Sequence, residues 1–290
     1  MKKLNLLIST ASILAILNCS NSVSSPYCNT YIDSGVSSTF SQNFTCAQVS
    51  VDGTNHVFKS SNLPNYKSYY YGSSSDLYES LPSGNKSAGN NQISSQNMKY
   101  SIPTTGTLRT SGALDGTQAG LVSIGITTNG LAIFNNAANA PDVLYTESFT
   151  FDNYAGHPQN SGIYHYHATP TKLTSDDANL IGVALDGFLI YGKKCNSGSG
   201  SDFALTQPTA AASGTVAADT GAGNGDGATS LDKLHGHTAT TKHLTTATYH
   251  YHLADDPKAR TDATGAGYTV TSFYTILSSY FRGVKGSVSN

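Results

Sequence analysis

The sequence predicts a mainly β protein, a β-sandwich or irregular β-barrel with few short helices. Charged residues make up only 12% of the chain, while Gly, Ser, Thr, Asn and Tyr are abundant. Helix formers such as Glu, Lys and Leu are scarce, whereas Thr and Tyr favour strands. Short apolar runs separated by tight-turn dipeptides add a third indication of strands joined by hairpins.

Residues 1–18 have the pattern of a secretory signal peptide. Met1-Lys2-Lys3 precede an apolar run from Leu4 to Leu17, which is too short to span a membrane. Cys19 follows directly in a sequence similar to a lipobox, although Asn18 is larger than the usual residue at that position. We therefore expect an exported protein of the cell envelope, anchored to membrane lipid through Cys19, with residues 19–36 as the tether. An ordinary signal peptide, cut between Cys19 and Ser25, would instead give a periplasmic or secreted protein.

Three cysteines remain after Cys19. Cys28 and Cys46 lie close together in the sequence, and export to an oxidising compartment favours a disulfide between them. Cys195 is then unpaired. It can be a buried thiol, which is the simplest interpretation, a metal ligand, or the partner of one of the other two.

The charge balance argues against a nucleic-acid-binding protein. The formal net charge of the chain is −2, and no run of basic residues with interleaved aromatics is present. The sequence does not identify a protein or small-molecule partner.

Two regions are expected after the tether. Residues 37–99 read as a small N-terminal segment of strands and loops, and residues 100–285 as the main domain. Within the main domain, residues 196–230 are low in complexity and rich in Gly, Ala, Ser, Thr and Asp. This composition predicts a flexible insertion.

Tight-turn dipeptides divide the main domain into hairpins. Asn129-Gly130 lies between the apolar runs 121–126 and 131–134. Asp186-Gly187 interrupts a second apolar run, residues 180–192, and predicts two short buried strands or one hairpin. Residues 268–281 are β-branched and aromatic and should form one or two closing strands.

The tetrapeptide Tyr-His-Tyr-His occurs twice, at residues 164–167 and 249–252. Successive side chains of a strand point to opposite faces, so His165 and His167 share one face about 7 Å apart, and the tyrosines share the other. His250 and His252 repeat the arrangement. Imidazoles at this spacing can converge on one zinc or copper ion, which is the cofactor that we expect.

Other residues extend this candidate site. Eight of the nine histidines fall between His157 and His252, and His237 is the best further ligand. Asp186 is the candidate catalytic carboxylate: it could bind the metal, orient a histidine or act as general base on a metal-bound water, or it could simply form the turn before Gly187. Weaker candidates for a supporting role are His157, Asp232, Tyr164 and Tyr249. The sequence leaves open whether the two tetrapeptides form one site or two.

Several motifs in order resemble the YHYH-motif domain family, secreted bacterial proteins that are named after the tetrapeptide. The resemblance covers roughly residues 100–285 and implies a fold and a site rather than a reaction. The motifs are Gly156-His157, Tyr164 to His167, Ile181-Gly182 through Gly192, Leu231-Asp232, Gly236-His237, Tyr249 to His252 and Phe281-Arg282-Gly283.

The chain also departs from that family pattern. Lys172, Leu234 and Tyr280 stand where the resemblance leads us to expect cysteines, and His235 stands in place of a different polar residue. The resemblance therefore implies that disulfides bracing the family site are missing here, and it gives His235 no role as a ligand.

Two functions from different classes follow. The first is an exported metal-binding protein, with a metalloenzyme of hydrolytic or redox chemistry as its catalytic version. The second is a non-catalytic surface module with a Tyr/His polar core. Under the first hypothesis Asp186 and at least three histidines should converge. Under the second, the imidazoles should point apart, or should bond to backbone and carboxylates with no open position. Neither a Gly-x-Ser-x-Gly nucleophile motif nor a Walker phosphate loop occurs.

Overall fold

The structure is a computed structural model. It describes residues 27–82, 88–117, 123–139, 142, 144–168, 170, 173, 179–196, 203–208, 210–220, 229–255, 274–275 and 278–290. The expected signal peptide, the lipidation site Cys19 and most of the expected closing strands at 268–281 lie outside these residues. Among the described residues, no helix is both long and apolar enough to cross a membrane.

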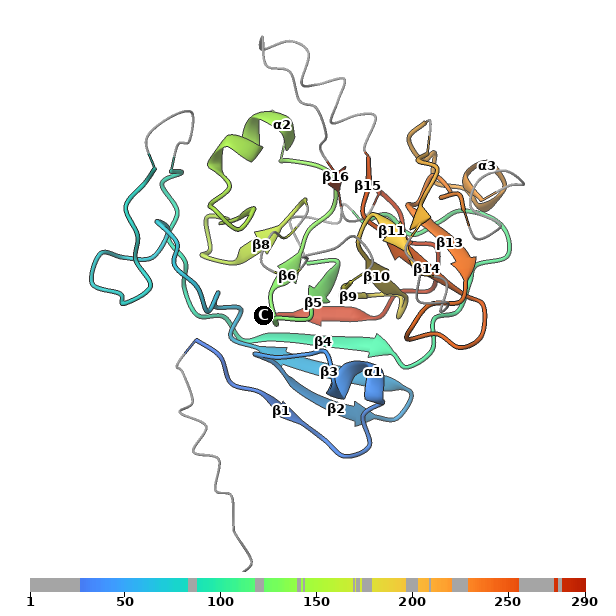
Figure 1. Cartoon of the computed structure of the whole chain (residues 1–290), viewed down its shortest axis with the longest axis horizontal. Helices are drawn as coiled ribbons and strands as arrows, with labels where there is room; N and C mark the ends of the chain where they lie inside the picture. Colours follow the sequence, from blue (N-terminus) through green and yellow to red (C-terminus); the bar gives the residue numbers. More distant parts are fainter. Residues whose placement is uncertain are drawn as a thin grey trace, which may run out of the picture.

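A five-stranded sheet is built from both ends of the described chain. Its strand order is β1-β2-β3-β4-β17, with β1 parallel to β2 and the other pairs antiparallel. Strands β2, β3 and β4 come from residues 48–103, whereas β17 comes from the C-terminus (Figure 1). The bounds are β1 (Tyr31–Ile32), β2 (Gln48–Asp52), β3 (Asn55–Ser60), β4 (Met98–Pro103) and β17 (Ser287–Ser289).

An eight-stranded sheet carries both Tyr-His-Tyr-His segments. Its strand order is β13-β14-β10-β9-β5-β6-β8-β7. The bounds are β5 (Gly125–Thr127), β6 (Ala132–Ile133), β7 (Gly156–Pro158), β8 (Tyr164–Tyr166), β9 (Leu180–Ala184), β10 (Leu189–Tyr191), β13 (Gly236–Ala239) and β14 (Thr248–His252).

The remaining elements are short. Two-stranded sheets join β11 (Lys194–Cys195) to β12 (Phe203–Ala204) and β15 (Ala254–Asp255) to β16 (Tyr274–Thr275). The helical segments have three or four residues each: α1 (Ser38–Ser41), α2 (Leu144–Glu147), η1 (Ser148–Thr150) and α3 (Val216–Asp219). The predicted mainly β class is confirmed, and neither large sheet closes into a barrel within the described part of the chain. Elements β12 and α3 lie in the expected insertion, of which residues 197–202 and 221–228 are outside the described ranges.

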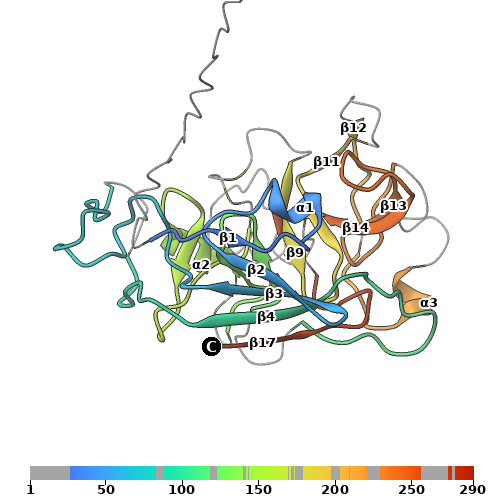
Figure 2. The same cartoon turned by 90° about the horizontal axis from the view of Figure 1, so that it is seen from below.

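The two large sheets form two layers around a shared core. Figure 1 places the five-stranded sheet below the eight-stranded sheet, and Figure 2, seen from below, shows it in front. Phe58 and Tyr100 from one sheet and Ile126, Ile133 and Val183 from the other are fully buried in one hydrophobic cluster. Burying side chains of this size stabilises a fold by about 1.5–3 kcal/mol each. The core thus receives side chains from both sides of the boundary expected near residue 99, and that boundary stays a prediction.

Both expected hairpins form around their tight-turn dipeptides. β5 pairs with β6 and β9 pairs with β10, in each case antiparallel. Gly130 and Gly187 have φ of +78° and +85°, which glycine adopts without the steric cost that a Cβ would bring. β5 is shorter than the strand expected at 121–126, of which residues 121 and 122 lie outside the described part.

The eight-stranded sheet is made of two halves with the same design. In each half a hairpin strand pairs parallel with the tetrapeptide strand, which pairs antiparallel with a Gly-His strand. The halves β5-β6-β8-β7 and β9-β10-β14-β13 meet where β5 pairs antiparallel with β9. The repeat that is visible in the sequence as a tetrapeptide is therefore one strand of a duplicated four-strand unit.

A tyrosine, an aspartate and a glycine fix the same local structure in each half. Tyr164 donates a hydrogen bond to Asp152 over 2.8 Å, and the carboxylate of Asp152 also accepts the backbone N–H of Gly156. A Cβ on Gly156 would lie 2.4 Å from the Tyr164 ring. In the second half, a Cβ on Gly236 would lie 2.2 Å from the hydroxyl of Tyr249. Only glycine lets the tyrosine lie flat against the turn and reach its carboxylate.

The disulfide between Cys28 and Cys46, which the sequence analysis favours, is present. It ties the start of the described chain to the residues just before β2. Thr30 strengthens this connection, because its hydroxyl accepts the backbone N–H of Cys46 over 2.8 Å.

Gly156→Ala and Gly236→Ala should each lower the free energy of unfolding by about 1–3 kcal/mol, because the added methyl overlaps a buried tyrosine ring. The measurement is urea denaturation in the presence of a chelator, which separates folding from metal binding. Gly35→Ala is the control, because an added Cβ there meets no atom within 4 Å. Equal stabilities for all three variants would contradict this account of the turn.

Candidate metal centres

The structure gathers six of the nine histidines into two groups, one in each half of the eight-stranded sheet. The first group contains His157, His165 and His167. The second group contains Cys195, His237, His250 and His252. Within each group, one possible ligand atom per residue lies within 4.8 Å of all the others. The two tetrapeptides therefore contribute to two separate groups rather than to one shared group, a choice that the sequence leaves open.

Strand pairing explains how each group forms. β7 pairs with β8 so that His157 lies opposite His165, and β13 pairs with β14 so that His237 lies opposite His250. The second histidine of each tetrapeptide follows on the same face, as strand alternation requires. His157, a weaker candidate from sequence, thus has the same position in its group as His237.

Hydrogen bonds fix the tautomer of two imidazoles in the first group. His165 Nδ1 lies 3.0 Å from the carbonyl of Ile163, and His167 Nδ1 lies 2.7 Å from the carbonyl of Asn135. A carbonyl oxygen only accepts, so both Nδ1 atoms carry the proton and, in the neutral rings, both Nε2 atoms present a lone pair. The two Nε2 atoms lie 3.0 Å apart. Two acceptors face each other without a donor between them.

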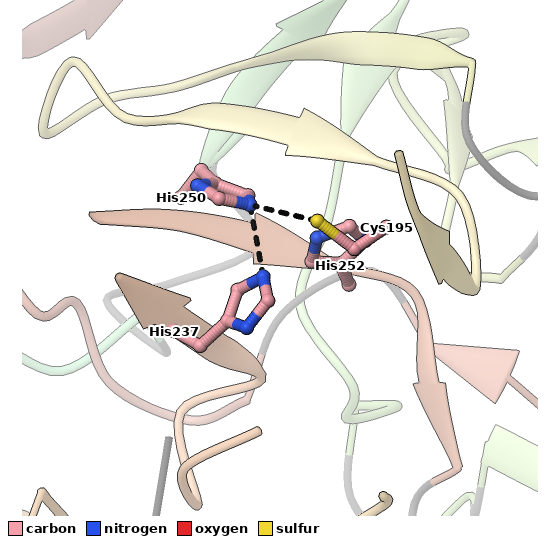
Figure 3. A group of neighbouring side chains, drawn as sticks. All are labelled: Cys195, His237, His250 and His252. Atoms are coloured by element: carbon pink, nitrogen blue, oxygen red, sulfur yellow. Dashed lines mark hydrogen bonds between the residues drawn. The ribbon is translucent and has the colours of Figure 1, made fainter. Parts of the chain in front are cut away.

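In the second group, two of the three imidazoles are likewise held by backbone carbonyls (Figure 3). His250 Nδ1 lies 2.8 Å from the carbonyl of Thr248, and His252 Nδ1 lies 2.6 Å from the carbonyl of Gly192. His250 Nε2 lies 3.0 Å from His237 Nε2 and 3.9 Å from Cys195 Sγ. His252 Nε2 is buried without a hydrogen-bond partner.

Burial keeps these rings neutral. Desolvation lowers the pKa of His157 to about 3, that of His167 to about 4 and that of His250 to about 3. Desolvation also lowers the pKa of His165 and of His252 well below the ordinary value. At neutral pH no proton is therefore available to bridge the Nε2 atoms of His165 and His167, and neutral imidazole is the form that binds metals.

The first group borders a cavity of about 410 Å³, and a carboxylate lies beside it. Glu147, on α2, places Oε1 at 3.7 Å from His157 Nε2 and Oε2 at 3.9 Å from His167 Nε2. Burial, with Asp142 as a smaller cause, raises the pKa of Glu147 to about 7. The second group has no such carboxylate among its members and contains a thiol instead.

Aromatic rings hold the imidazoles in position in both groups. Phe134 stacks on His165 with the ring centres 3.9 Å apart, and Tyr191 stacks on His252 with the centres 5.6 Å apart. Both aromatic residues end the hairpin strand beside the tetrapeptide. His157 is oriented differently, because its Nδ1 is 2.7 Å from the hydroxyl of Thr150.

The structure does not bring Asp186 to either histidine group. Its carboxylate is fully buried, accepts hydrogen bonds from Tyr251 over 2.6 Å and from the backbone N–H of Gly283 over 3.0 Å, and forms the turn with Phe188. Burial raises its pKa to about 6. Asp186 lies on the tyrosine side of β14, so alternation separates it from the imidazoles. Its expected catalytic role stays a prediction.

Asp232 and the first tyrosines of the tetrapeptides also belong to that opposite side. Asp232 accepts hydrogen bonds from Tyr249 over 2.8 Å and from the backbone N–H groups of Leu234 and Gly236. Tyr164 has the equivalent bond to Asp152. None of these residues joins a histidine group, and their expected supporting role stays a prediction.

Sequence reasoning missed Glu147 and left Cys195 undecided. Glu147 lies outside every motif, and only the path of the chain through α2 brings it to His157. Cys195 precedes His237 by a long segment, and only the β10-β14 pairing places it beside His250. The equal spacing of four residues from Asp152 to Gly156 and from Asp232 to Gly236 is a signal that could have raised His157 to equality with His237.

Comparison with known proteins gives one match. A family model described as "YHYH protein" matches residues 99–265, which include every member of both histidine groups and Glu147. No curated protein and no solved structure matches the chain.

Replacing Asp232 with Asn should change how stability depends on pH. Burial raises the pKa of Asp232 to about 7, so the folded state holds a proton that the unfolded state has released, and the parent loses stability as pH rises from about 4 to 7. The asparagine of Asp232→Asn cannot ionise. The parent should therefore lose stability relative to this variant as the pH rises from about 4 to 7. The measurement is chelator-treated urea unfolding at several pH values, with exposed Asp52→Asn as the control. A constant difference between parent and Asp232→Asn would contradict the assignment.

Proposed function

This chain belongs to the YHYH protein family, and because the matched residues include both histidine groups, we propose that it is a metal-binding protein with two metal centres. Each centre holds one transition-metal ion, zinc or copper. Neutral imidazole is a preferred ligand of both metals, and thiolate suits zinc and copper(I).

The observation that carries the proposal is the convergence of imidazole nitrogens. In the first group the Nδ1–H groups of His165 and His167 donate to backbone carbonyls, and their unprotonated Nε2 atoms lie 3.0 Å apart. In the second group His250 and His252 donate to backbone carbonyls in the same way, and His250 Nε2 lies 3.0 Å from His237 Nε2. Two nitrogens bound to one tetrahedral ion lie about 3.4 Å apart, so little movement separates this arrangement from a coordinated one. Without a cation, the facing lone pairs of His165 and His167 destabilise the fold, because each lacks the donor that water would supply.

The two donor sets differ in the number of coordination positions on the metal that they leave unfilled. Three imidazoles and the Cys195 thiolate complete a four-coordinate site, which is the usual form of a structural zinc centre. The three imidazoles of the first group leave one position unfilled beside Glu147, which is the usual form of a centre that binds an exchangeable ligand. A metalloenzyme activity would belong to the first group, because that group has the unfilled coordination position.

The proposed location is the cell envelope. Export rests on the signal-like residues 1–18, and anchoring rests on lipidation of Cys19. The Cys28–Cys46 disulfide supports an oxidising compartment, because such bonds persist outside the cytoplasm.

The full chain, purified without chelator or histidine tag, should contain close to two equivalents of zinc or copper by elemental analysis. His165→Ala/His167→Ala should remove one equivalent, and His250→Ala/His252→Ala should remove the other. His243→Ala is the matched control, because its ring contacts Tyr191 and belongs to neither group. It should retain both equivalents.

A folded protein that stays free of metal after zinc and copper are both added would overturn the proposal. It would favour the non-catalytic surface module, in which the paired Tyr-His strands serve only as a polar core.

Cobalt(II) should separate the two centres spectroscopically. A cobalt-thiolate bond gives an intense near-ultraviolet charge-transfer band that imidazole ligands do not produce. The cobalt-loaded parent should show this band, and Cys195→Ser should lose it while keeping the first centre. A band that survives in Cys195→Ser would exclude Cys195 as a ligand.

A further inference from the structure

We propose that the first histidine group and Glu147 form an open centre that binds a small, uncharged, polyhydroxylated molecule from solution. The inference rests on the proposed metal function and names the ligand class of one of its two sites. The second group has no such role, because its four members are almost completely buried, with exposed fractions of 1% or less.

The cavity beside the first group has the size and position for a ligand. Its volume is about 410 Å³, within the range of about 300–1,000 Å³ that is usual for small-molecule sites. His157, His165 and His167 all line it, so a molecule in the cavity reaches the position where their Nε2 atoms converge. The metal would thus lie at the floor of a cavity rather than inside the core.

Glu147 is placed to contact a molecule bound at that position. Its two oxygens lie 3.7 and 3.9 Å from His157 Nε2 and His167 Nε2, slightly farther than donors that share one ion. Oε2 is buried and has no hydrogen-bond partner. A hydroxyl bound to the metal at the open position would donate its hydrogen to this oxygen, which satisfies a buried acceptor that otherwise lacks a donor.

The charges around the cavity favour an uncharged ligand. The lining contains the carboxylates of Asp142 and Glu147 and, among the described residues, neither lysine nor arginine. The acidic side chains weaken the attraction of the metal ion for phosphates and carboxylates, and the metal ion weakens the attraction of the acidic side chains for an amine. A neutral molecule avoids both costs.

The polar side chains of the wall favour hydroxyl groups. The amides of Asn91, Asn139, Gln159 and Asn160 line the cavity, and amides both donate and accept. Gln159 Oε1 is buried without a partner, although its amide nitrogen already donates to Ser161. The ring of Tyr70 contributes an apolar surface, because its hydroxyl is committed to the carbonyl of Thr150. A neutral sugar presents matching hydroxyls and an apolar face.

Three related probes test the ligand class: glucose as the neutral probe, glucosamine as the cation and glucose 6-phosphate as the anion. Each is titrated into the cobalt-loaded full chain, and the visible d–d spectrum of cobalt is followed. Glucose should change the spectrum with saturation, whereas the two charged probes should bind about tenfold more weakly or not at all. The response should persist in Cys195→Ser and disappear in His165→Ala/His167→Ala.

Glu147→Gln should weaken glucose binding about tenfold while leaving the cobalt content and the melting temperature unchanged, since the amide oxygen of glutamine is a weaker acceptor than a carboxylate. Glu79→Gln is the matched control, because Glu79 is the other glutamate of the chain and lies outside the cavity. Equal binding by parent and Glu147→Gln would overturn the assignment of Glu147.

The outcomes distinguish a failure of the proposed metal function from a failure of the proposed ligand class. A protein that takes up no cobalt contradicts the proposed metal function itself. A protein that holds two equivalents of cobalt but responds to none of the probes, or only to a charged one, contradicts this inference and leaves the metal function standing.

Discussion

The buried bond between a tetrapeptide tyrosine and an aspartate is the constraint on which the rest of the site depends. Tyr164 reaches Asp152 and Tyr249 reaches Asp232, each across a glycine that has no Cβ to block the ring. The same carboxylates accept the backbone N–H of the glycine that begins the Gly-His strand. This bond therefore sets the register in which one histidine lies opposite another. Once the tyrosines occupy one face, alternation leaves the histidines no position other than the opposite one.

The eight-stranded sheet contains this bond twice, once in each four-strand half, and the two halves differ in their surroundings. In both halves a stacked aromatic ring and backbone carbonyls orient the imidazoles, and burial keeps them neutral. The difference lies in the neighbour supplied by the surrounding chain. Cys195 closes the second group, whereas α2 and a cavity border the first. The same four-strand arrangement can thus hold either a closed structural metal centre or a centre that binds an exchangeable ligand.

The positions of the aspartates show why residue type alone does not identify a catalytic group. Asp186 has the burial and the raised pKa that are typical of functional carboxylates, yet its partners are Tyr251, a turn and Gly283. Its burial is explained by structure on the tyrosine side of the sheet. Glu147 has less burial and no motif, and it is the carboxylate that reaches the imidazoles.

The sequence by itself determined the features that depend on near neighbours. Strand alternation separates His165 and His167 from the tyrosines, glycine in Asn129-Gly130 and Asp186-Gly187 permits tight turns, and the low content of helix formers predicts a mainly β chain. These are local properties of the backbone. The sequence also favoured the Cys28–Cys46 pair, because the two residues are close along the chain.

Only the tertiary structure decided which residues meet. The pairing of β10 with β14 brings Cys195 to His250, the pairing of β7 with β8 brings His157 to His165, and the path of α2 brings Glu147 to the first group. It also decided that the tetrapeptides form two groups and that Asp186 lies away from both. Such contacts depend on strand order across the whole sheet. Strand order is set by packing between distant segments, and no local pattern of residues encodes it.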